Sequence, residues 1–478
     1  MTSKKTLNTG NLATLGADRL AALLMDISQG NAAIKRRLRL ELIGEDSPAE
    51  LAKEVRKRLA TIARSRSFVD WQNRKALVDD LEAQRWAIVL QVAKRAPADA
   101  LALMWQFLDL ARSVFERCDD SSGTISAVFH AAVGDLRDVA QAARPDSKQL
   151  ADQVFGALVH NDYGQYDNLI HVLQPALGPV GLEHLKQRMV ALSAEPVRKP
   201  AAEERQVIGW ASSGPLYADD IAEQPRVSTV RLALRDIADA QGDVDAYIAQ
   251  YDQKVRKFPK IAAEIAKRLV AAGRAEEAWQ IIEASEHRHP GLPDFEWEDA
   301  RIEVLEALGR GDEAQAARWT CFERFLSARY LRDYLKRLPD FDDFEAEQRA
   351  LDYAERNGSL LTAISFLVSW PALDRAARLV MERAKALDGN HYEILTPAAE
   401  ALAGKYPLAA TLLLRAMIDF ALTQGRSSRY GHAARHLRDC AGFAAVISDY
   451  GPFEPHDAYI ARLRREHGRK TGFWSAVS

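Results

Sequence analysis

Two stretches in the second half of the chain, LVAAGRAEEAW at residues 269–279 and LEALGRGDEAQ at residues 305–315, decide the fold. Aligned at Gly273 and Gly309, they share leucine, alanine, glycine, arginine, glutamate and alanine at an offset of 36 residues. A third copy, ADAQGDVDAYI, has its glycine at Gly242. Each copy predicts a helix, a turn and a second helix. Such a pair is too short to bury its apolar face alone, so we expect an α-solenoid of stacked antiparallel helix pairs.

The first of the two aligned copies partly resembles the tetratricopeptide pattern. It has Ala278, then Ile282 where that pattern has phenylalanine, then Pro290. The tryptophan and tyrosine positions of the first helix are missing, so we describe the repeats as tetratricopeptide-like only. Gly358 and Gly404 indicate further helix pairs at wider intervals.

The rest of the chain is also typical of helices. Apolar residues recur at i, i+3, i+4 and i+7 over residues 17–28, 97–117 and 124–143, whereas alternating patterns are almost absent. In SPAE at residues 47–50 the serine can cap a helix, the proline suits its first position and the glutamate completes a capping box. The sequence therefore predicts an all-α protein.

The clearest interruption of this pattern is the segment around residues 194–225, which is rich in proline, alanine and charge and has no helical period. We expect an N-terminal helical domain at 1–194, a linker or surface loop at 195–225, a helical-repeat domain at 226–450 and a basic helical C-terminal tail at 451–478.

The composition is that of an ordinary globular protein. Of the 478 residues, 47% are hydrophobic and 27% are charged, and the formal net charge of −3 provides no overall attraction for nucleic acid. The three cysteines, Cys118, Cys321 and Cys440, are scattered and odd in number, which argues against a disulfide framework and favours a reducing compartment. The N-terminus has no signal-peptide pattern, and no apolar run approaches the ~18 residues of a transmembrane helix. We therefore expect a cytoplasmic protein that does not bind membranes.

The C-terminal part carries a resemblance to known proteins. YPLAATLLLRAMIDFALTQGRSSRYGHAARHLRDC and the closing HDAYIARLRREHGRKTGFW resemble the helical-repeat C-terminal region of bacterial SWIM zinc-finger proteins. The N-terminal half, with FERCDDSSG at 115–123 and DYGQYD at 162–167, is similar to an uncharacterised bacterial family that shares this region. The resemblance implies a helical-repeat protein of unknown activity without a known catalytic residue. The CxC…CxH pattern of the zinc finger itself is absent, so its nucleic-acid role does not carry over.

A basic segment lies at residues 49–68, AELAKEVRKRLATIARSRSF. Its predicted buried stripe consists of Leu51, Val55, Leu59 and Ile62. Its opposite, basic face consists of Lys53, Arg56, Lys57 and Arg64. Residues 35–75 contain 12 Lys or Arg and 6 Asp or Glu, a local charge of +6. Such a face can bind a polyanion through the phosphates of that polyanion, but exposed charge also keeps an ordinary helix soluble. We favour the second interpretation, in which the basic face is only solvated.

Two loops dense in carboxylates and small residues lie between predicted helices. The candidate binding residues in them are Asp119, Asp120, Asp162, Tyr163, Tyr166 and Asp167. The carboxylates could gather around a hard cation, or the tyrosines could contact a partner peptide. Because aspartate, serine, asparagine and glycine also supply helix caps and turns, we favour the capping interpretation.

His432, His436 and Cys440 stand four residues apart on one predicted helix face, as metal ligands would. No HExxH element accompanies them, and we expect neither a metal nor another cofactor. Phosphate-binding GxxxxGK[ST], GxGxxG and GxSxG motifs are absent as well.

These observations favour a non-enzymatic helical-repeat scaffold that binds a protein or peptide, because stacked helix pairs create extended binding surfaces. The alternative is binding of nucleic acid or another polyanion through the basic helices at 35–75. The identity of the partner cannot be read from the residues.

Overall fold

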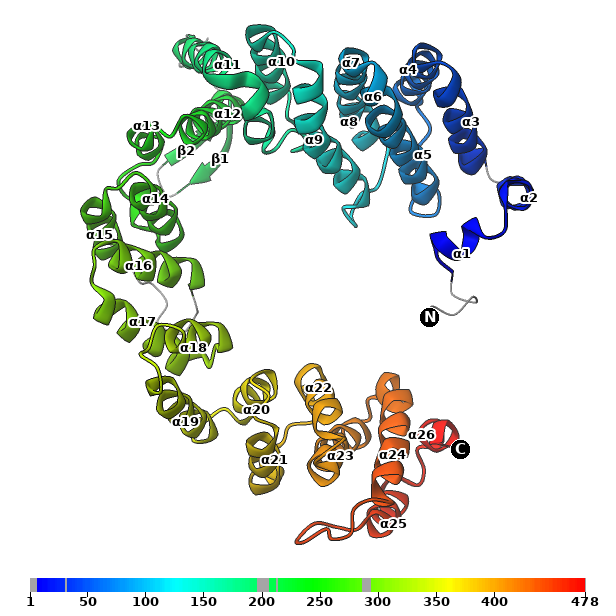
Figure 1. Cartoon of the computed structure of the whole chain (residues 1–478), viewed down its shortest axis with the longest axis vertical. Helices are drawn as coiled ribbons and strands as arrows, with labels where there is room; N and C mark the ends of the chain where they lie inside the picture. The colour runs from blue at the N-terminus through cyan, green and yellow to red at the C-terminus, as the bar shows by residue number, and fades with distance from the viewer. Residues whose placement is uncertain (1–6, 31, 196–205, 212–213, 286–293, 478) are drawn as a thin grey trace. The chain divides into compact units, whose positions relative to one another are not determined.

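The computed structural model describes residues 7–30, 32–195, 206–211, 214–285 and 294–477, and Pro290 lies outside these ranges. The described residues form helices joined by short turns, together with one two-stranded sheet (Figure 1). The protein is therefore all-α, as the sequence predicts. None of the helices in these ranges combines the length and the apolar character needed to cross a lipid bilayer.

The helices form two compact units, Met1–Asp252 and Gln253–Ser478. The first unit contains the helices α1 (Thr9–Ala13), α2 (Ala17–Ser28), α3 (Ala32–Asp46), α4 (Pro48–Arg64), α5 (Arg74–Trp86), the π-helix η1 (Ala87–Val92), α6 (Ala93–Arg95), α7 (Pro97–Leu108), α8 (Leu110–Phe115), α9 (Thr124–Ala143), α10 (Ser147–Val159), α11 (Leu169–Ala194), α12 (Ala218–Gln241) and α13 (Val244–Ala249), and the strands β1 (Val207–Ala211) and β2 (Gly214–Tyr217).

Helix α4 shows how the first unit acquires its core. The Ser47 hydroxyl accepts a hydrogen bond from the Glu50 backbone N–H (3.3 Å), and proline occupies the first helical position. The four apolar residues of the predicted stripe, Leu51, Val55, Leu59 and Ile62, are all buried. The predicted amphipathic helix is therefore confirmed.

The division between the units differs from the one expected from composition. Helix α12 packs against α10 and α11, its Ile237 is fully buried, and the Gln174 side chain donates to the Ala240 carbonyl (2.9 Å). The described parts of 195–225 form an antiparallel β1–β2 hairpin and the start of α12, with Pro225 inside that helix. Residues 226–252 thus belong to the first unit, because the apolar face of α12 is buried there.

The second unit contains the short 3₁₀ helices η2 (Val255–Lys257), η3 (Ala384–Ala386) and η4 (Ser427–Arg429), and the helices α14 (Pro259–Ala271), α15 (Ala275–Ala284), α16 (Phe295–Ala307), α17 (Gly311–Phe325), α18 (Ala328–Leu335), α19 (Asp342–Glu355), α20 (Leu360–Ser369), α21 (Leu373–Glu382), α22 (Tyr392–Leu402), α23 (Pro407–Thr423), α24 (Tyr430–Ala444), α25 (His456–His467) and α26 (Thr471–Val477).

Within this unit the helices pack against their neighbours in sequence. Helix α14 contacts α15 and α16, α20 contacts α21 and α22, and α23 contacts α22 and α24. The last segment, expected as a basic tail at 451–478, contributes to the same core, because Tyr459, Leu463 and Phe473 of α25 and α26 are fully buried. Of its basic residues, Arg464 and Arg465 of α25 are exposed.

The repeated glycines end helices, as predicted. Gly242, Gly273 and Gly309 have φ of 70°, 75° and 71°. Next to Gly273, the Arg274 N–H donates to the Leu269 carbonyl (2.8 Å). This 6→1 backbone hydrogen bond and the left-handed glycine together form a Schellman motif, which ends a helix. Gly358 and Gly404 also lie between helices, before α20 and α23.

An arginine–glutamate pair follows two of these turns at the same repeat position. Arg274 donates through Nε and Nη2 to the two carboxylate oxygens of Glu277, at 2.7 Å each. Arg310 does the same to Glu313, at 2.7 and 2.6 Å. The Arg310 guanidinium also lies over the Trp279 ring, 4.3 Å from its centroid. The two aligned copies thus share the same arginine–glutamate contact.

Candidate functional site

A cavity of about 820 Å³ opens between α22, α23 and α24 in the second unit. Helix α23 provides its floor through Leu414, Met417 and Ala421, which are buried. This helix is apolar on nearly all sides, so it lies between its neighbours and buries opposite faces against them. Small residues on the flanking helices, Ala399 and Ala433 among them, leave the space open.

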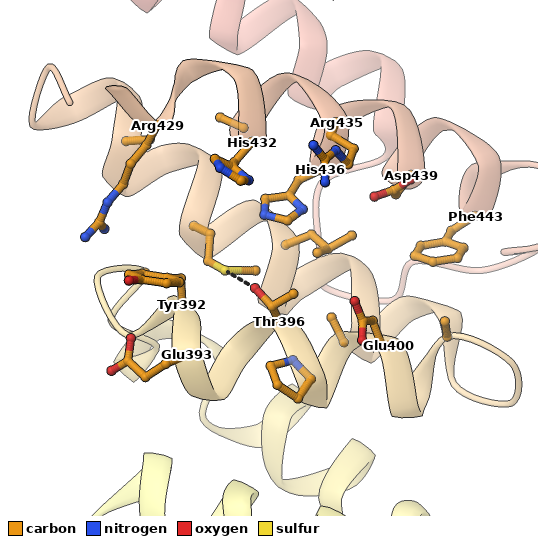
Figure 2. A pocket seen from close by; sticks show the side chains of 18 of the residues that line it. Tyr392, Glu393, Thr396, Glu400, Arg429, His432, Arg435, His436, Asp439 and Phe443 are labelled. Carbon is orange, nitrogen blue, oxygen red and sulfur yellow. Dashed lines mark hydrogen bonds between the residues drawn. The ribbon is translucent and has the colours of Figure 1, made fainter. Parts of the chain in front are cut away.

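The two flanking helices form walls of different charge. Figure 2 shows Arg429, His432, Arg435, His436, Asp439 and Phe443 on one side and Tyr392, Glu393, Thr396 and Glu400 on the other. The wall formed by α22 therefore carries two carboxylates. The wall formed by η4 and α24 carries two guanidinium groups, two imidazoles and one carboxylate.

The charged groups of the two walls influence each other without direct contact, since Glu400 acts to raise the pKa of His436 against the larger effect of burial. Within the described part of the chain, no hydrogen bond or ion pair joins Glu393 or Glu400 to a residue of α24. At one end of the cavity Arg429 donates to the Asn390 side chain (3.1 Å) and lies over the Tyr392 ring at 4.9 Å. The polar groups along the middle of both walls are thus available to a ligand.

His436 occupies the centre of the basic wall and is half-buried. Burial lowers its pKa, an effect that Asp439 and Glu400 oppose and the neighbouring His432 and Arg435 reinforce. Its imidazole is therefore neutral at pH 7 and presents one hydrogen-bond donor and one acceptor.

Cys440, the third residue of the His432, His436 and Cys440 series, points away from the cavity. Cys440 is fully buried against α23, with Sγ 4.0 Å from the Thr411 carbonyl oxygen, and burial raises its pKa to about 12. Because successive i, i+4 positions drift around a helix, the thiol faces the core while His432 and His436 line the cavity. Among the described residues no group of His, Cys, Asp or Glu is arranged to hold a metal ion.

The first acidic loop caps a helix. The Asp120 carboxylate accepts hydrogen bonds from the backbone N–H groups of Ile125 and Ser126, both at 2.9 Å, at the start of α9. Burial raises the pKa of Asp120, but these hydrogen bonds outweigh burial and the net shift is downward. Asp119 accepts from the Ser121 N–H (3.0 Å) in a local turn.

The second acidic loop is held by its own side chains. Asp167 accepts from the Asn161 amide (2.9 Å), and the buried Tyr166 donates its hydroxyl proton to Asp109 (3.0 Å). Tyr163 stacks on Phe115 at 5.1 Å. These contacts are those of a folded turn, and binding by Asp162 and its neighbours stays a prediction.

The basic face of α4 is presented to solvent. Lys53, Arg56, Lys57 and Arg64 are all exposed, and none of the four forms an ion pair with another described residue. By contrast Arg58, on the same helix, pairs with the buried Asp80. The structure therefore groups the four predicted residues on one accessible face without showing what it contacts.

A comparison with protein families covers almost the whole chain, because one family model matches residues 2–476. The chain belongs to the family of unknown function DUF6880. No curated protein and no solved structure matches it. Membership in DUF6880 agrees with the expected uncharacterised family, and a relation to the SWIM proteins is not shown.

For this DUF6880 chain, sequence reasoning identified His432 and His436 but not the acidic wall opposite them. Glu400 and Thr396 lie on an ordinary amphipathic helix and carry no motif. The available signal was the run of alanines that includes Ala399 and Ala403, which line the cavity. Small residues on facing helices leave room between them, but only the fold reveals which helices face each other.

Proposed function

We propose that the protein is a non-enzymatic helical-repeat scaffold that binds a peptide segment of a protein partner in the cavity between α22, α23 and α24. The packing of each helix against its sequence neighbours and the recurring glycine turns support an α-solenoid with tetratricopeptide-like units. Such stacks commonly bind extended or helical peptides along one face.

The observation that carries the proposal is the combination of an apolar floor with two oppositely charged walls. Leu414 and Met417 can cover an apolar side chain of a peptide. Glu393 and Glu400 can accept hydrogen bonds from basic or amide groups, and Arg435 can donate to acidic groups. A peptide carrying both charge signs around an apolar residue therefore fits this cavity.

The neutral imidazole of His436 adds a group suited to a peptide backbone. A peptide bond presents one N–H donor and one C=O acceptor, and a neutral imidazole can satisfy either. A volume of about 820 Å³ is in the range of ligand sites and accommodates several side chains.

The remaining elements of the proposal rest on the sequence. We place the protein in the cytoplasm, because its three cysteines are scattered and odd in number, which favours a reducing compartment. The stretch 406–440, which supplies α23 and α24, is also the one that resembles the SWIM helical region. A shared peptide-binding role of that region is part of the proposal.

A displayed library of random peptides, selected on the full-length protein, tests the proposal. We expect enriched peptides that combine charged residues of both signs with an apolar residue. Replacing Thr396 by Trp fills the cavity and should abolish their binding, whereas Arg438→Glu on the outer face of α24 should not. Enriched peptides that bind the Thr396→Trp variant as well as wild type would refute this site.

The second candidate function is polyanion binding by α4. It is favoured by the exposure of Lys53, Arg56, Lys57 and Arg64 on one face. Binding through several phosphates weakens steeply with salt, so titration with DNA or RNA at several ionic strengths tests it. We expect no binding at ~0.15 M salt. A sub-micromolar complex under those conditions that is lost on the triple change Lys53→Ala, Lys57→Ala, Arg64→Ala would make this the leading function.

A further inference from the structure

A second cavity, of about 1150 Å³, lies on the other side of α23 and contains an arginine that forms no ion pair with another described residue. The Arg415 side chain lines this cavity, yet the residue is only 6% exposed. Its Nη1 donates to the Glu454 backbone carbonyl (2.6 Å), and its guanidinium lies 4.3 Å from the centre of the Tyr459 ring. These contacts fix the orientation of the guanidinium plane.

The opposite edge of that plane has no hydrogen-bond acceptor beside it among the described residues. Nε and Nη2 of Arg415 are buried and have no hydrogen-bond partner in the described part of the chain. These two nitrogens form the edge through which arginine binds a carboxylate with two parallel hydrogen bonds. The same edge of Arg274 and of Arg310 holds a glutamate in the repeats described above.

Two carboxylates that line the same cavity are already engaged by other groups. Asp419 accepts from the Tyr459 hydroxyl (3.0 Å) and from Arg462 (3.1 Å). The Glu454 carboxylate also pairs with Arg462, at 3.1 Å. Arg462 thus pairs with two carboxylates, whereas Arg415 pairs with none among the described residues. A buried charge without a partner is strongly destabilising.

A second buried side chain close to Arg415, that of His456, also has an unpartnered nitrogen. His456 is 9% exposed, and its Nδ1 also has no hydrogen-bond partner among the described residues. Burial lowers the pKa of His456, the positive charge of Arg415 lowers it further, and Asp457 opposes both effects. A negative group beside Arg415 would offset the effect of the Arg415 charge.

We propose that the free edge of Arg415 is a binding site for a carboxylate group that enters this second cavity. The lining includes four basic and four acidic side chains and so has no net charge, which favours a monoanion over the dianion of phosphate. The planar carboxylate also matches the two parallel donors of the arginine edge. The carboxylate can belong to a free small acid or to the C-terminus of a peptide.

Isothermal titration calorimetry of the full-length protein tests this proposal, with sodium chloride at matched ionic strength as the reference. The probes are sodium acetate, inorganic phosphate, and acetylated trialanine with either a free or an amidated C-terminus. We expect acetate to bind the wild-type protein and the Arg438→Met variant, which removes an exposed positive charge that does not line this cavity. Arg415→Met should weaken binding roughly 30-fold or more, since it removes one partner of a buried charged pair.

The peptide probes distinguish the two sources of the carboxylate. Tighter binding of the free-acid peptide than of acetate would identify a peptide C-terminus, and equal affinity would identify a free small acid. An Arg415→Lys variant keeps the positive charge but lacks the two parallel N–H donors of arginine, so it too should lose binding. Circular dichroism checks that this variant folds. Undetectable binding of acetate and peptide, unchanged affinity in either Arg415 variant, or tighter binding of phosphate would overturn the proposal.

Discussion

Replacing Gly273 or Gly309 by alanine should destabilise the second unit by about 1 kcal/mol. At φ of 75° and 71° an L-residue costs roughly 1–2 kcal/mol. The lower conformational entropy of the unfolded alanine variant offsets roughly 0.4–1 kcal/mol of this cost. No atom lies within 4 Å of the Cβ that either substitution adds, so no steric clash contributes. For a unit of this size we expect the unfolding midpoint to fall by about 2–4 °C.

Thermal and urea unfolding followed by circular dichroism measure this change, and Gly311→Ala provides the matched control. Gly311 begins α17, has no left-handed backbone conformation and also has open space at its Cβ. This control should therefore be neutral or slightly stabilising, because alanine is the better helix former. Equal effects of Gly309→Ala and Gly311→Ala would show that backbone conformation at the repeat turn does not determine the loss.

Three further outcomes are expected. Asp120→Ala should lower the free energy of unfolding by about 1–2 kcal/mol at pH 7. The folded pKa of Asp120 lies below the unfolded value of about 3.9, so the ionised carboxylate stabilises the fold above about pH 3.9. Denaturation curves over a pH series should show the difference in stability between variant and wild type shrinking as the pH falls through the folded pKa of Asp120. Burial raises the pKa values of Cys321 and Cys440 to about 12, so a thiol-reactive dye at pH 8 should label neither until denaturant is added, and rapid labelling of both would contradict their burial. Gly389→Ala places a Cβ against the Ala416 carbonyl, so it should lower the unfolding midpoint more than Gly273→Ala does.

The parts of the fold that depend on local pattern could be predicted from the sequence. The buried stripe of α4 follows from a 3.6-residue period within one helix, and the turn at Gly273 follows from the conformational freedom of glycine. The boundary between the two units could not be predicted from the sequence, because Pro225 and the alanine-rich composition around it are typical of a linker. Only the burial of Ile237 against α10 and α11 shows where α12 belongs.

The candidate sites could be predicted only where they lie on one element. His432 and His436 share a face of α24, and their spacing indicated it. The pairing of that face with Glu400, from a different helix, depends on tertiary packing. The unpartnered edge of Arg415 could likewise not be predicted, because the sequence does not show which carboxylates Arg462 binds.

The affinity of one selected peptide for two charge-reversal variants, Arg435→Glu and Arg438→Glu, tests peptide binding most directly. Both changes lie on α24 and alter the net charge equally, but only Arg435 lines the cavity. Peptide binding in the cavity predicts that Arg435→Glu raises the Kd roughly tenfold or more while Arg438→Glu leaves it within about twofold. Equal Kd values for the two variants would contradict it.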